Sequence, residues 1–262
     1  MSKIKEKIES VNRKNQKALT IFLTSGYPDP DTFVELALGI VDSGADILEI
    51  GVPFGDSLAD GPVVQASYIK SINQGVNLYK TFELIAQIKK YSDVPVVLMG
   101  SGNPVLNIGK ESFIDRAAEA KINGVIIPDV PLEEYDNFID DRFKGLDTIL
   151  LTTPTSSRER IRDIDDKSSG FVYCVSVVGT TGIRKQVDEY VYDNLKLTYD
   201  TLEKNKMQIG FGISSPERVK EFTPYCDGVI VGSAIIKSLE SDDKKYTNTM
   251  AFVKSLKEAC YY

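Results

Sequence analysis

The stretch "ADILEIGVPFGDSLADGPVVQASYIKSI" (residues 45–72) contains an apolar run, a loop and a second run with different spacing. Residues 45–52 are almost continuously apolar, which is typical of a strand buried on both faces of a parallel sheet. The glycines and prolines of residues 53–62 make the loop too stiff to be helical, and the run after Pro62 has helical character. We therefore interpret residues 45–72 as a strand, a loop and a helix.

The same alternation repeats along the chain. Short β-rich runs are separated by segments with helical spacing of apolar residues, as at Phe33, Leu36, Ala37 and Ile40. Eight strands are expected, at residues 18–25, 45–52, 94–100, 124–129, 147–152, 170–176, 207–213 and 228–233. Eight strand–helix repeats are typical of a parallel (β/α)₈ barrel, whereas a doubly wound open sheet normally needs fewer strands. We predict an α/β fold of the TIM-barrel class, with one domain over residues 1–262.

An extra helix is expected before the first strand. Ile4, Ile8 and Val11 have the spacing of one helix face, and this helix could close the bottom of the barrel. No linker or low-complexity segment divides the chain. The single-domain prediction rests on this continuity.

The composition narrows the class of protein. The chain has 262 residues, 42% of them hydrophobic, and a formal net charge of −7. The excess of acidic over basic residues argues against a nucleic-acid or anionic-membrane partner, because a protein surface that binds either one needs clustered Lys and Arg. No apolar stretch is long enough to span a membrane and the first residues lack the apolar core of a signal peptide, so we expect a cytoplasmic protein. The three cysteines, Cys174, Cys226 and Cys260, are expected to be buried free thiols.

The chain contains no histidine. Serine–histidine and cysteine–histidine nucleophile pairs are therefore excluded, and the commonest metal ligand is missing, so we expect no metal site. No lysine lies at the predicted strand ends, which disfavours a Schiff-base mechanism. Acid–base chemistry must come from carboxylates, Tyr, Lys or Cys.

Glycine-bearing turns follow the sixth, seventh and eighth predicted strands, at residues 177–185, 210–219 and 232–239. Ser215 before Pro216 has the pattern of a helix N-cap, and Gly232 and Ser233 precede another helical run. Barrels frequently hold phosphate at these loops, next to a short extra helix whose N–H groups are free. We predict a phosphate site with short extra helices there. The alternative is that the glycines only form tight turns.

Two carboxylates are candidates for chemistry. Glu49 is a charged residue near the end of an otherwise apolar strand, where burial would raise its pKa from about 4.3 toward neutrality. The alternative is a structural carboxylate bonded to amides or to an arginine. Asp60 precedes Gly61 and Pro62 and could simply cap a turn or helix, and Asp56 is most simply a residue that shapes the loop.

Residues 48–62 resemble the motif LExGxPFSDPxADGP of the tryptophan synthase alpha subunit family. The likeness extends along essentially the whole chain, through "TSGYPD" (24–29), "NPVLNIG" (103–109), "PDVPLEE" (128–134), "GTTG" (179–182), "GFGISSPE" (210–217) and "GSAIIK" (232–237). The resemblance implies reversible retro-aldol cleavage of indole-3-glycerol phosphate to indole and glyceraldehyde 3-phosphate, in tryptophan biosynthesis. It makes the chain a carbon–carbon lyase.

At matching positions the resemblance implies that Glu49 and Asp60 are the catalytic pair. Glu49 would move the protons at indole C3 and at the glycerol hydroxyl, and Asp60 would accept the charge of the ring N–H. The implied substrate-binding residues comprise an indole pocket of Phe22, Tyr173 and Phe211, and phosphate contacts at Gly182, Gly212, Gly232 and Ser233, with Thr181 pairing with Asp60 on loop closure. The aromatic residues could equally be barrel core.

The family also implies a partner. Its members pair with a beta subunit that carries pyridoxal phosphate, in an αββα heterotetramer, and the alpha chain itself uses no cofactor. The loops after the second and sixth strands and residues 128–134 would form the contact, and Asp129 is either a partner contact or a helix cap. The chain departs from the family at Gly55, Ser57 and Val177, where serine, proline and arginine are common. These departures predict weaker loop closure or coupling.

Three alternatives remain at this level. A stand-alone indole-3-glycerol phosphate lyase that releases free indole would have the same residues. A non-catalytic binding subunit would not need the carboxylate pair. A different phosphosugar enzyme on this fold, such as an isomerase, is disfavoured because no Lys lies at the predicted strand ends and the chain has no His.

Overall fold

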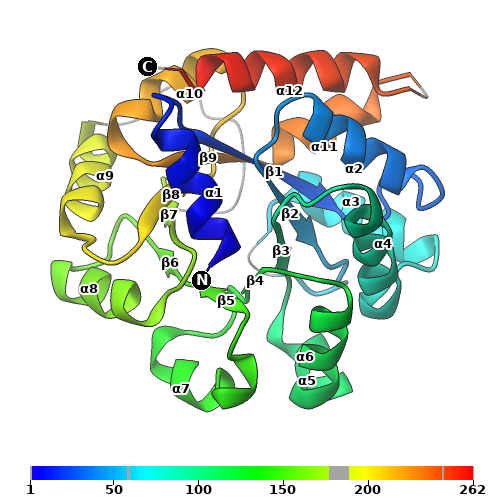
Figure 1. The fold of residues 1–262 in the computed structure, drawn as a ribbon, viewed down its shortest axis with the longest axis horizontal. Helices are drawn as coiled ribbons and strands as arrows, with labels where there is room; N and C mark the ends of the chain where they lie inside the picture. The colour runs from blue at the N-terminus through cyan, green and yellow to red at the C-terminus, as the bar shows by residue number, and fades with distance from the viewer. Residues whose placement is uncertain (1, 58–59, 177–188, 244, 262) are drawn as a thin grey trace.

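The computed structural model describes residues 2–57, 60–176, 189–243 and 245–261 and places helices around a ring of parallel strands (Figure 1). The side chains of residues 189 and 190 lie outside this description. Nine strands are found in the described ranges: β1 Ala18–Thr24, β2 Ile47–Gly51, β3 Val96–Met99, β4 Gly124–Ile126, β5 Asp147–Ile149, β6 Leu151–Thr152, β7 Phe171–Val175, β8 Lys206–Gly210 and β9 Gly228–Val231. The predicted TIM-barrel fold is confirmed.

The strands run in the order β5-β4-β3-β2-β1-β9-β8-β7-β6, with every pair parallel. The first and last strands of this order are separated only by Leu150, which closes the ring. The Leu150 carbonyl accepts a hydrogen bond from the Tyr173 N–H at 3.0 Å, and its own N–H donates to the Ser168 hydroxyl at 3.2 Å. Residues 147–152, predicted as one strand, are therefore interrupted at Leu150 and form β5, which pairs with β4, and β6, which pairs with β7.

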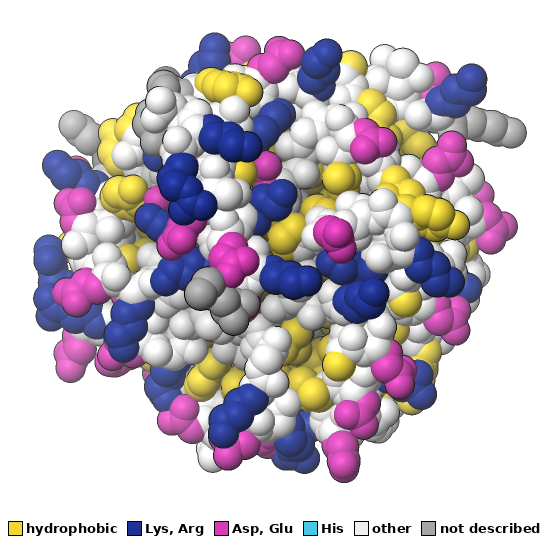
Figure 2. All heavy atoms as spheres, in the orientation of Figure 1, with side chains coloured by type: hydrophobic (Ala, Val, Ile, Leu, Met, Phe, Trp, Pro, Cys, Tyr) yellow, Lys and Arg dark blue, Asp and Glu magenta, His cyan; other side chains and the backbone are white. Residues whose placement is uncertain are grey.

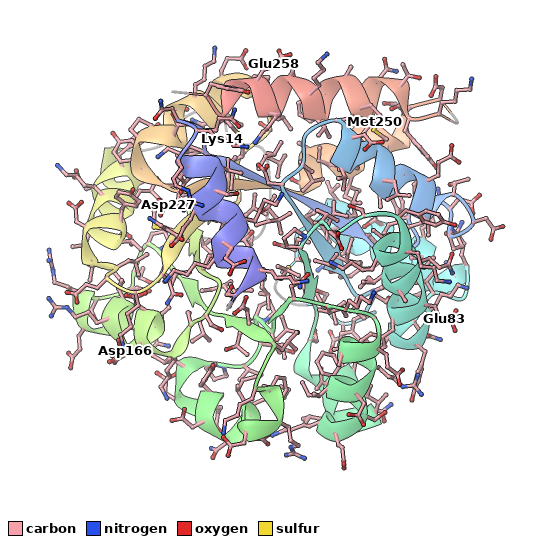
Figure 3. The ribbon with its side chains drawn as sticks, in the orientation of Figure 1. Lys14, Glu83, Asp166, Asp227, Met250 and Glu258 are labelled. Atoms are coloured by element: carbon pink, nitrogen blue, oxygen red, sulfur yellow. The ribbon has the colours of Figure 1, made fainter. Side chains whose placement is uncertain are left out.

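Helices cover the outside of the ring. Those in the described ranges are α1 Lys3–Asn12, α2 Phe33–Asp42, α3 Pro62–Asn73, α4 Leu78–Tyr91, α5 Gly102–Ile108, α6 Lys110–Glu119, α7 Tyr135–Phe138, α8 Arg158–Lys167, α9 Glu189–Thr201, α10 Pro216–Phe222, α11 Ser233–Glu240 and α12 Thr247–Ala259, with 3₁₀ turns η1 Leu132–Glu134, η2 Asp141–Phe143 and η3 Thr223–Tyr225. The predicted apolar face of α2 is buried. In Figure 3, Met250 of α12 lies between α12 and α2, where Gly39 leaves room for its side chain.

Helix α1 lies across the amino ends of the strands (Figure 1). Its N-cap Ser2 donates from Oγ to Asp147 Oδ2 at 2.5 Å, at the start of β5. At its other end, Asn12 Nδ2 donates to the Asp227 carbonyl at 2.8 Å, next to the start of β9. Ile4 and Ile8 of this helix are fully buried. The prediction that this helix closes the bottom of the barrel is confirmed.

The surface has no large region of one charge on the face that Figure 2 shows, where Lys and Arg are mixed with Asp and Glu. The three cysteines are free and buried, as predicted, and burial raises the pKa of Cys174 to about 11. Within the described ranges no helix is long and apolar enough to cross a membrane.

Candidate active site

A cavity of about 450 Å³ opens at the carboxyl ends of the strands, opposite α1. The strands, the loops that follow them and helices α3 and α11 bring to it residues that are far apart in the sequence: Phe22, Glu49, Asp60, Val64, Met99, Tyr173, Phe211, Gly212, Ile213, Ile230, Gly232 and Ser233. Every predicted site residue that the structure describes is in this set. Thr181 and Gly182 lie outside the described residues, as does Val177.

Glu49 lies in the third position of β2 and is 2% exposed. It pairs in register with Phe22 of β1, so parallel pleating points both side chains into the barrel. Burial, and secondarily the charge of Asp60, raises the pKa of Glu49 to about 8. Its Oε2 has no hydrogen-bond partner among the described residues, and no ion pair in those ranges includes it. The structure therefore does not support the alternative of a satisfied structural carboxylate.

Asp60 is 6% exposed and lies on the loop between β2 and α3. Burial raises its pKa, and a hydrogen bond from the Ser57 hydroxyl to Asp60 Oδ2 opposes that rise. Helix α3 begins at Pro62 with Gly61 as its N-cap and no side-chain cap. Because Asp60 does not cap α3, its carboxylate is available to the cavity.

Aromatic rings form one wall. The rings of Tyr173 and Phe211 meet edge to face, with centroids 6.0 Å apart. A Cβ atom at Gly210 would come within 2.0 Å of the Tyr173 hydroxyl, so only glycine lets this ring reach the cavity. Burial, followed by the charges of Glu49 and Asp60, raises the pKa of Tyr173 well above its usual value. The two rings form an angled aromatic wall, and Glu49 and Asp60 line the same cavity.

The start of helix α11 suits an anion. Helix α11 begins at Ser233 with Gly232 as N-cap, and the Gly232 carbonyl already accepts from Ile235 N–H at 2.8 Å. The first N–H groups of a helix have no carbonyl partner within it and can stabilise an anion, and Gly232 and Ser233 both line the cavity. Ser215 accepts from Arg218 N–H and caps α10, as predicted.

The turn after β8 has a constrained backbone. Phe211 and Gly212 have φ of 71° and 74°, in the left-handed region that a non-glycine residue adopts at a cost. Ser176 holds this turn, because its hydroxyl donates to the Phe211 carbonyl at 2.6 Å and to the Gly210 carbonyl at 3.1 Å. The sequence placed Ser176 only at a strand end and did not reveal this role.

Several cavity residues were not predicted: Val64, Met99, Ile213 and Ile230. Met99 and Ile230 lie at or next to the carboxyl ends of β3 and β9, so the position of a residue in its strand could have found them. Tyr68 of α3 was also missed. Burial, then the charges of Asp60 and Glu49, raises its pKa well above its usual value, so its hydroxyl lies in the field of both carboxylates.

A second cavity of about 420 Å³ adjoins the first, and Asp60 and Met99 line both. Its other residues include Asp56, Ser57, Tyr68, Ser101 and Asp129. Asp129 Oδ1 accepts from the Gly102 N–H at 2.9 Å, at the start of α5, so it caps this helix.

The assembled site brings a buried carboxyl of raised pKa and a second carboxylate into one cavity with aromatic rings and a helix N-terminus. The first group can donate a proton near neutral pH, and the second can accept one or stabilise positive charge. A flat heterocycle joined to a phosphate fits this order of groups. No cluster of metal-binding side chains occurs in the ranges that the structure describes.

Comparison with known proteins gives a consistent result. The family model described as "Tryptophan synthase alpha chain" matches residues 8–260. The tryptophan synthase alpha chain of Petrotoga mobilis is 42% identical over 264 residues, covering 98% of this chain and 99% of that protein. The one from Geotalea uraniireducens is 39% identical over 261 residues, covering 98% and 97%.

Solved structures are similar over the same length. Tryptophan synthase subunit alpha from Legionella pneumophila has a TM-score of 0.87 at 31% identity, covering 99% of this chain and 98% of that one. A chain in the structure of Mycobacterium tuberculosis tryptophan synthase has a TM-score of 0.90 at 29% identity, covering 100% and 99%.

Proposed function

Because the chain belongs to the tryptophan synthase alpha chain family, whose members are the subunit that cleaves indole-3-glycerol phosphate in tryptophan biosynthesis, we propose that Glu49 and Asp60 carry out this cleavage. The observation that carries the proposal is the position of Glu49. It is a buried carboxyl with a pKa of about 8, it faces a cavity, and Asp60 lies in the same cavity.

Glu49 acts first as an acid and then as a base. Near neutral pH its carboxyl is largely protonated and adds this proton to indole C3, so that the ring becomes a leaving group. The resulting carboxylate takes the proton of the glycerol hydroxyl while the C–C bond breaks. The hydroxyl carbon becomes the aldehyde of glyceraldehyde 3-phosphate, and the bonding electrons return to the ring. Glu49 is protonated again at the end of the step.

Asp60 acts at the ring nitrogen. Protonation at C3 places positive charge on the ring and makes its N–H acidic. An ionised Asp60 either stabilises this charge or accepts the N–H proton. When the C–C bond breaks, the proton returns to the nitrogen and indole is restored. A residue on a loop also suits closure over bound substrate, which excludes water.

The remaining predicted residues bind substrate in this proposal. Phe22, Tyr173 and Phe211 hold the indole ring, and Gly212, Gly232 and Ser233 hold the phosphate at the start of α11. Gly182 and Thr181 keep the roles that the family resemblance implies. The support for these assignments is that all the described members line one cavity.

The family also implies a complex with a beta subunit. We propose that the complex is an αββα heterotetramer, that pyridoxal phosphate belongs to the beta subunit, and that this chain needs no cofactor. We further propose a cytoplasmic location and a single domain over residues 1–262. A beta subunit that raises the cleavage rate would support the complex, whereas an isolated chain as fast as the complexed one would favour a stand-alone lyase.

The catalytic assignment is tested with Glu49→Gln and Asp60→Asn. Each variant is assayed for release of glyceraldehyde 3-phosphate, with and without a beta subunit, and for binding of the same product by calorimetry. We expect kcat to fall by at least about 10²-fold for each, with product affinity nearly unchanged. An unaltered turnover in Glu49→Gln would instead support a non-catalytic binding subunit, and a loss of affinity equal to the loss of rate would refute the roles.

A further inference from the structure

The carboxylate of Asp60 has one hydrogen-bond donor among the described residues, the hydroxyl of Ser57. Both side chains are buried, Ser57 at 8% exposure and Asp60 at 6%. The hydroxyl donates to Oδ2, and Oδ1 has no hydrogen bond to any described residue. Asp60 lines both cavities, whereas Ser57 lines only the second, so the donor lies on the side away from the indole pocket.

Ser57 is itself held from α3. The Gln65 side chain donates from Nε2 to the Ser57 carbonyl at 2.9 Å. Gln65 lies in the first turn of α3, and its backbone N–H donates to the Gly61 carbonyl at 3.0 Å. The helix therefore fixes the loop at Ser57, and Ser57 fixes the orientation of Asp60.

The surroundings of Asp60 otherwise oppose its charge. Glu49 of β2 carries a like charge when ionised, and Tyr68 of α3 and Tyr173 of β7 are acids whose pKa the charge of Asp60 raises. Asp56 lines the second cavity beside it. A hydrogen bond to an ionised carboxylate favours the ionised form, and Ser57 is the group that lowers the pKa of Asp60 against burial.

We propose that Ser57 is a positioning residue for Asp60. The Ser57 hydroxyl holds Oδ2 of Asp60 and leaves Oδ1 of Asp60 free for the indole N–H. This inference rests on the proposed function, because it gives Asp60 the role of an ionised acceptor. Ser57 thus stabilises the acceptor, where the sequence alone suggested only a softer loop.

The test compares Ser57→Ala with Ser57→Thr, which keeps a hydroxyl, in the full chain with a beta subunit. The readout is the pH profile of kcat/KM for cleavage of indole-3-glycerol phosphate, together with the separate values of kcat and KM. For Ser57→Ala we expect the acidic limb to move to higher pH, because Asp60 must be ionised, and kcat to fall about tenfold near neutral pH with little change in KM. Ser57→Thr should keep the profile and rate of the original chain.

Two comparisons keep the inference falsifiable. Ser101→Ala removes a hydroxyl that also lines the second cavity but makes no side-chain cap of α5, and it should change neither limb nor rate. An acidic limb in Ser57→Ala that matches the original chain, or a Ser57→Thr variant as impaired as Ser57→Ala, overturns the inference. Asp60→Asn, assayed in parallel, separates the role proposed for Asp60 from the role proposed for Ser57. If Asp60→Asn retains full activity, the proposed role of Asp60 fails independently of Ser57.

A second measurement does not depend on activity. The free energy of unfolding is measured for Ser57→Ala, Asp60→Ala and the double variant. Two groups that share a hydrogen bond give a non-additive double variant, whereas independent groups add. Additive effects would overturn the hydrogen bond between Ser57 and Asp60. This measurement also applies when a single variant is too unstable for the kinetic assay.

Discussion

Glu49 combines burial with an Oε2 atom that has no hydrogen-bond partner among the described residues, and a buried charge without a partner is unfavourable. The protein avoids this cost by keeping the carboxyl protonated, which is the form that the proposed first step needs. The same property that makes Glu49 a useful acid makes the folded state sensitive to alkaline pH.

The pH dependence of stability follows from the raised pKa of Glu49. Its pKa is about 8 in the folded protein against 4.5 as the ordinary value, so the folded state binds more protons between these values. The contribution of Glu49 is fully favourable below about pH 4.5 and is lost as the pH rises through about 8. We predict that Glu49→Gln, which cannot ionise, becomes more stable than the original chain at pH 9 by a few kcal/mol, on the order expected from the shift.

Urea unfolding at pH 5, 7 and 9 checks this prediction. Glu119→Gln, which changes an exposed glutamate of α6, is the matched control and should follow the original chain at each pH. A constant difference between Glu49→Gln and the original chain across this range would mean that Glu49 ionises normally.

At the scale of elements, Asp165 of α8 organises the connection from α9 to β8. It is buried, and its carboxylate accepts the backbone N–H groups of Glu203, Lys204 and Asn205 at 2.7, 2.8 and 2.9 Å. The Asn205 side chain adds a further hydrogen bond at 3.0 Å. One carboxylate therefore satisfies the backbone of a whole turn, which fixes where β8 begins.

We predict that Asp165→Ala lowers the free energy of unfolding by about 2–4 kcal/mol, because it leaves several backbone N–H groups without their charged acceptor. The neighbouring Asp166 pairs with Lys204 at 2.8 Å, with both side chains 61% exposed, and points to solvent in Figure 3. Asp166→Ala should cost less than about 1 kcal/mol, as exposed pairs do. Equal losses in the two variants, measured by chemical denaturation, would contradict the role of Asp165.

At the scale of the whole molecule, the barrel has a stability end and a functional end. Helix α1 closes the amino ends of the strands, where Ile4 is fully buried beside Gly124 and Ile149. The candidate site occupies the carboxyl ends. Barrels of this class separate the two roles in this way, so changes at one end should spare the other.

We predict that Ile4→Ala destabilises the protein by about 2–4 kcal/mol through the cavity that it leaves, while kcat and KM at permissive temperature stay unchanged. Ile69→Ala, at a side chain of α3 that is 55% exposed, should cost less than about 0.5 kcal/mol. Thermal unfolding and the cleavage assay measure both quantities. A change in KM for Ile4→Ala comparable to the loss of stability would show that the two ends are coupled.

The residues that were predicted for the site and that the structure describes converge on one cavity, and each was recognisable from a local pattern. The position of Glu49 at the end of an apolar strand, the N-cap at Ser215 and the helix start at Ser233 are all readable from neighbouring residues. The break at Leu150 was not predicted, because it depends on the pairing of residues 147–152 with the strands on either side. Tyr68 was also missed, because its proximity to both carboxylates arises from how α3 packs on the barrel.

The sequence by itself determined the alternation of strands and helices, the absence of histidine chemistry and the family motif, since each is a property of residue types and their spacing. The tertiary structure alone decided the pKa of Glu49, the hydrogen bond between Ser57 and Asp60 and the second cavity, since these depend on burial and on neighbours brought together by folding. A carboxylate has the same chemistry wherever it stands in a chain, and only the medium around it fixes whether it carries a proton at neutral pH.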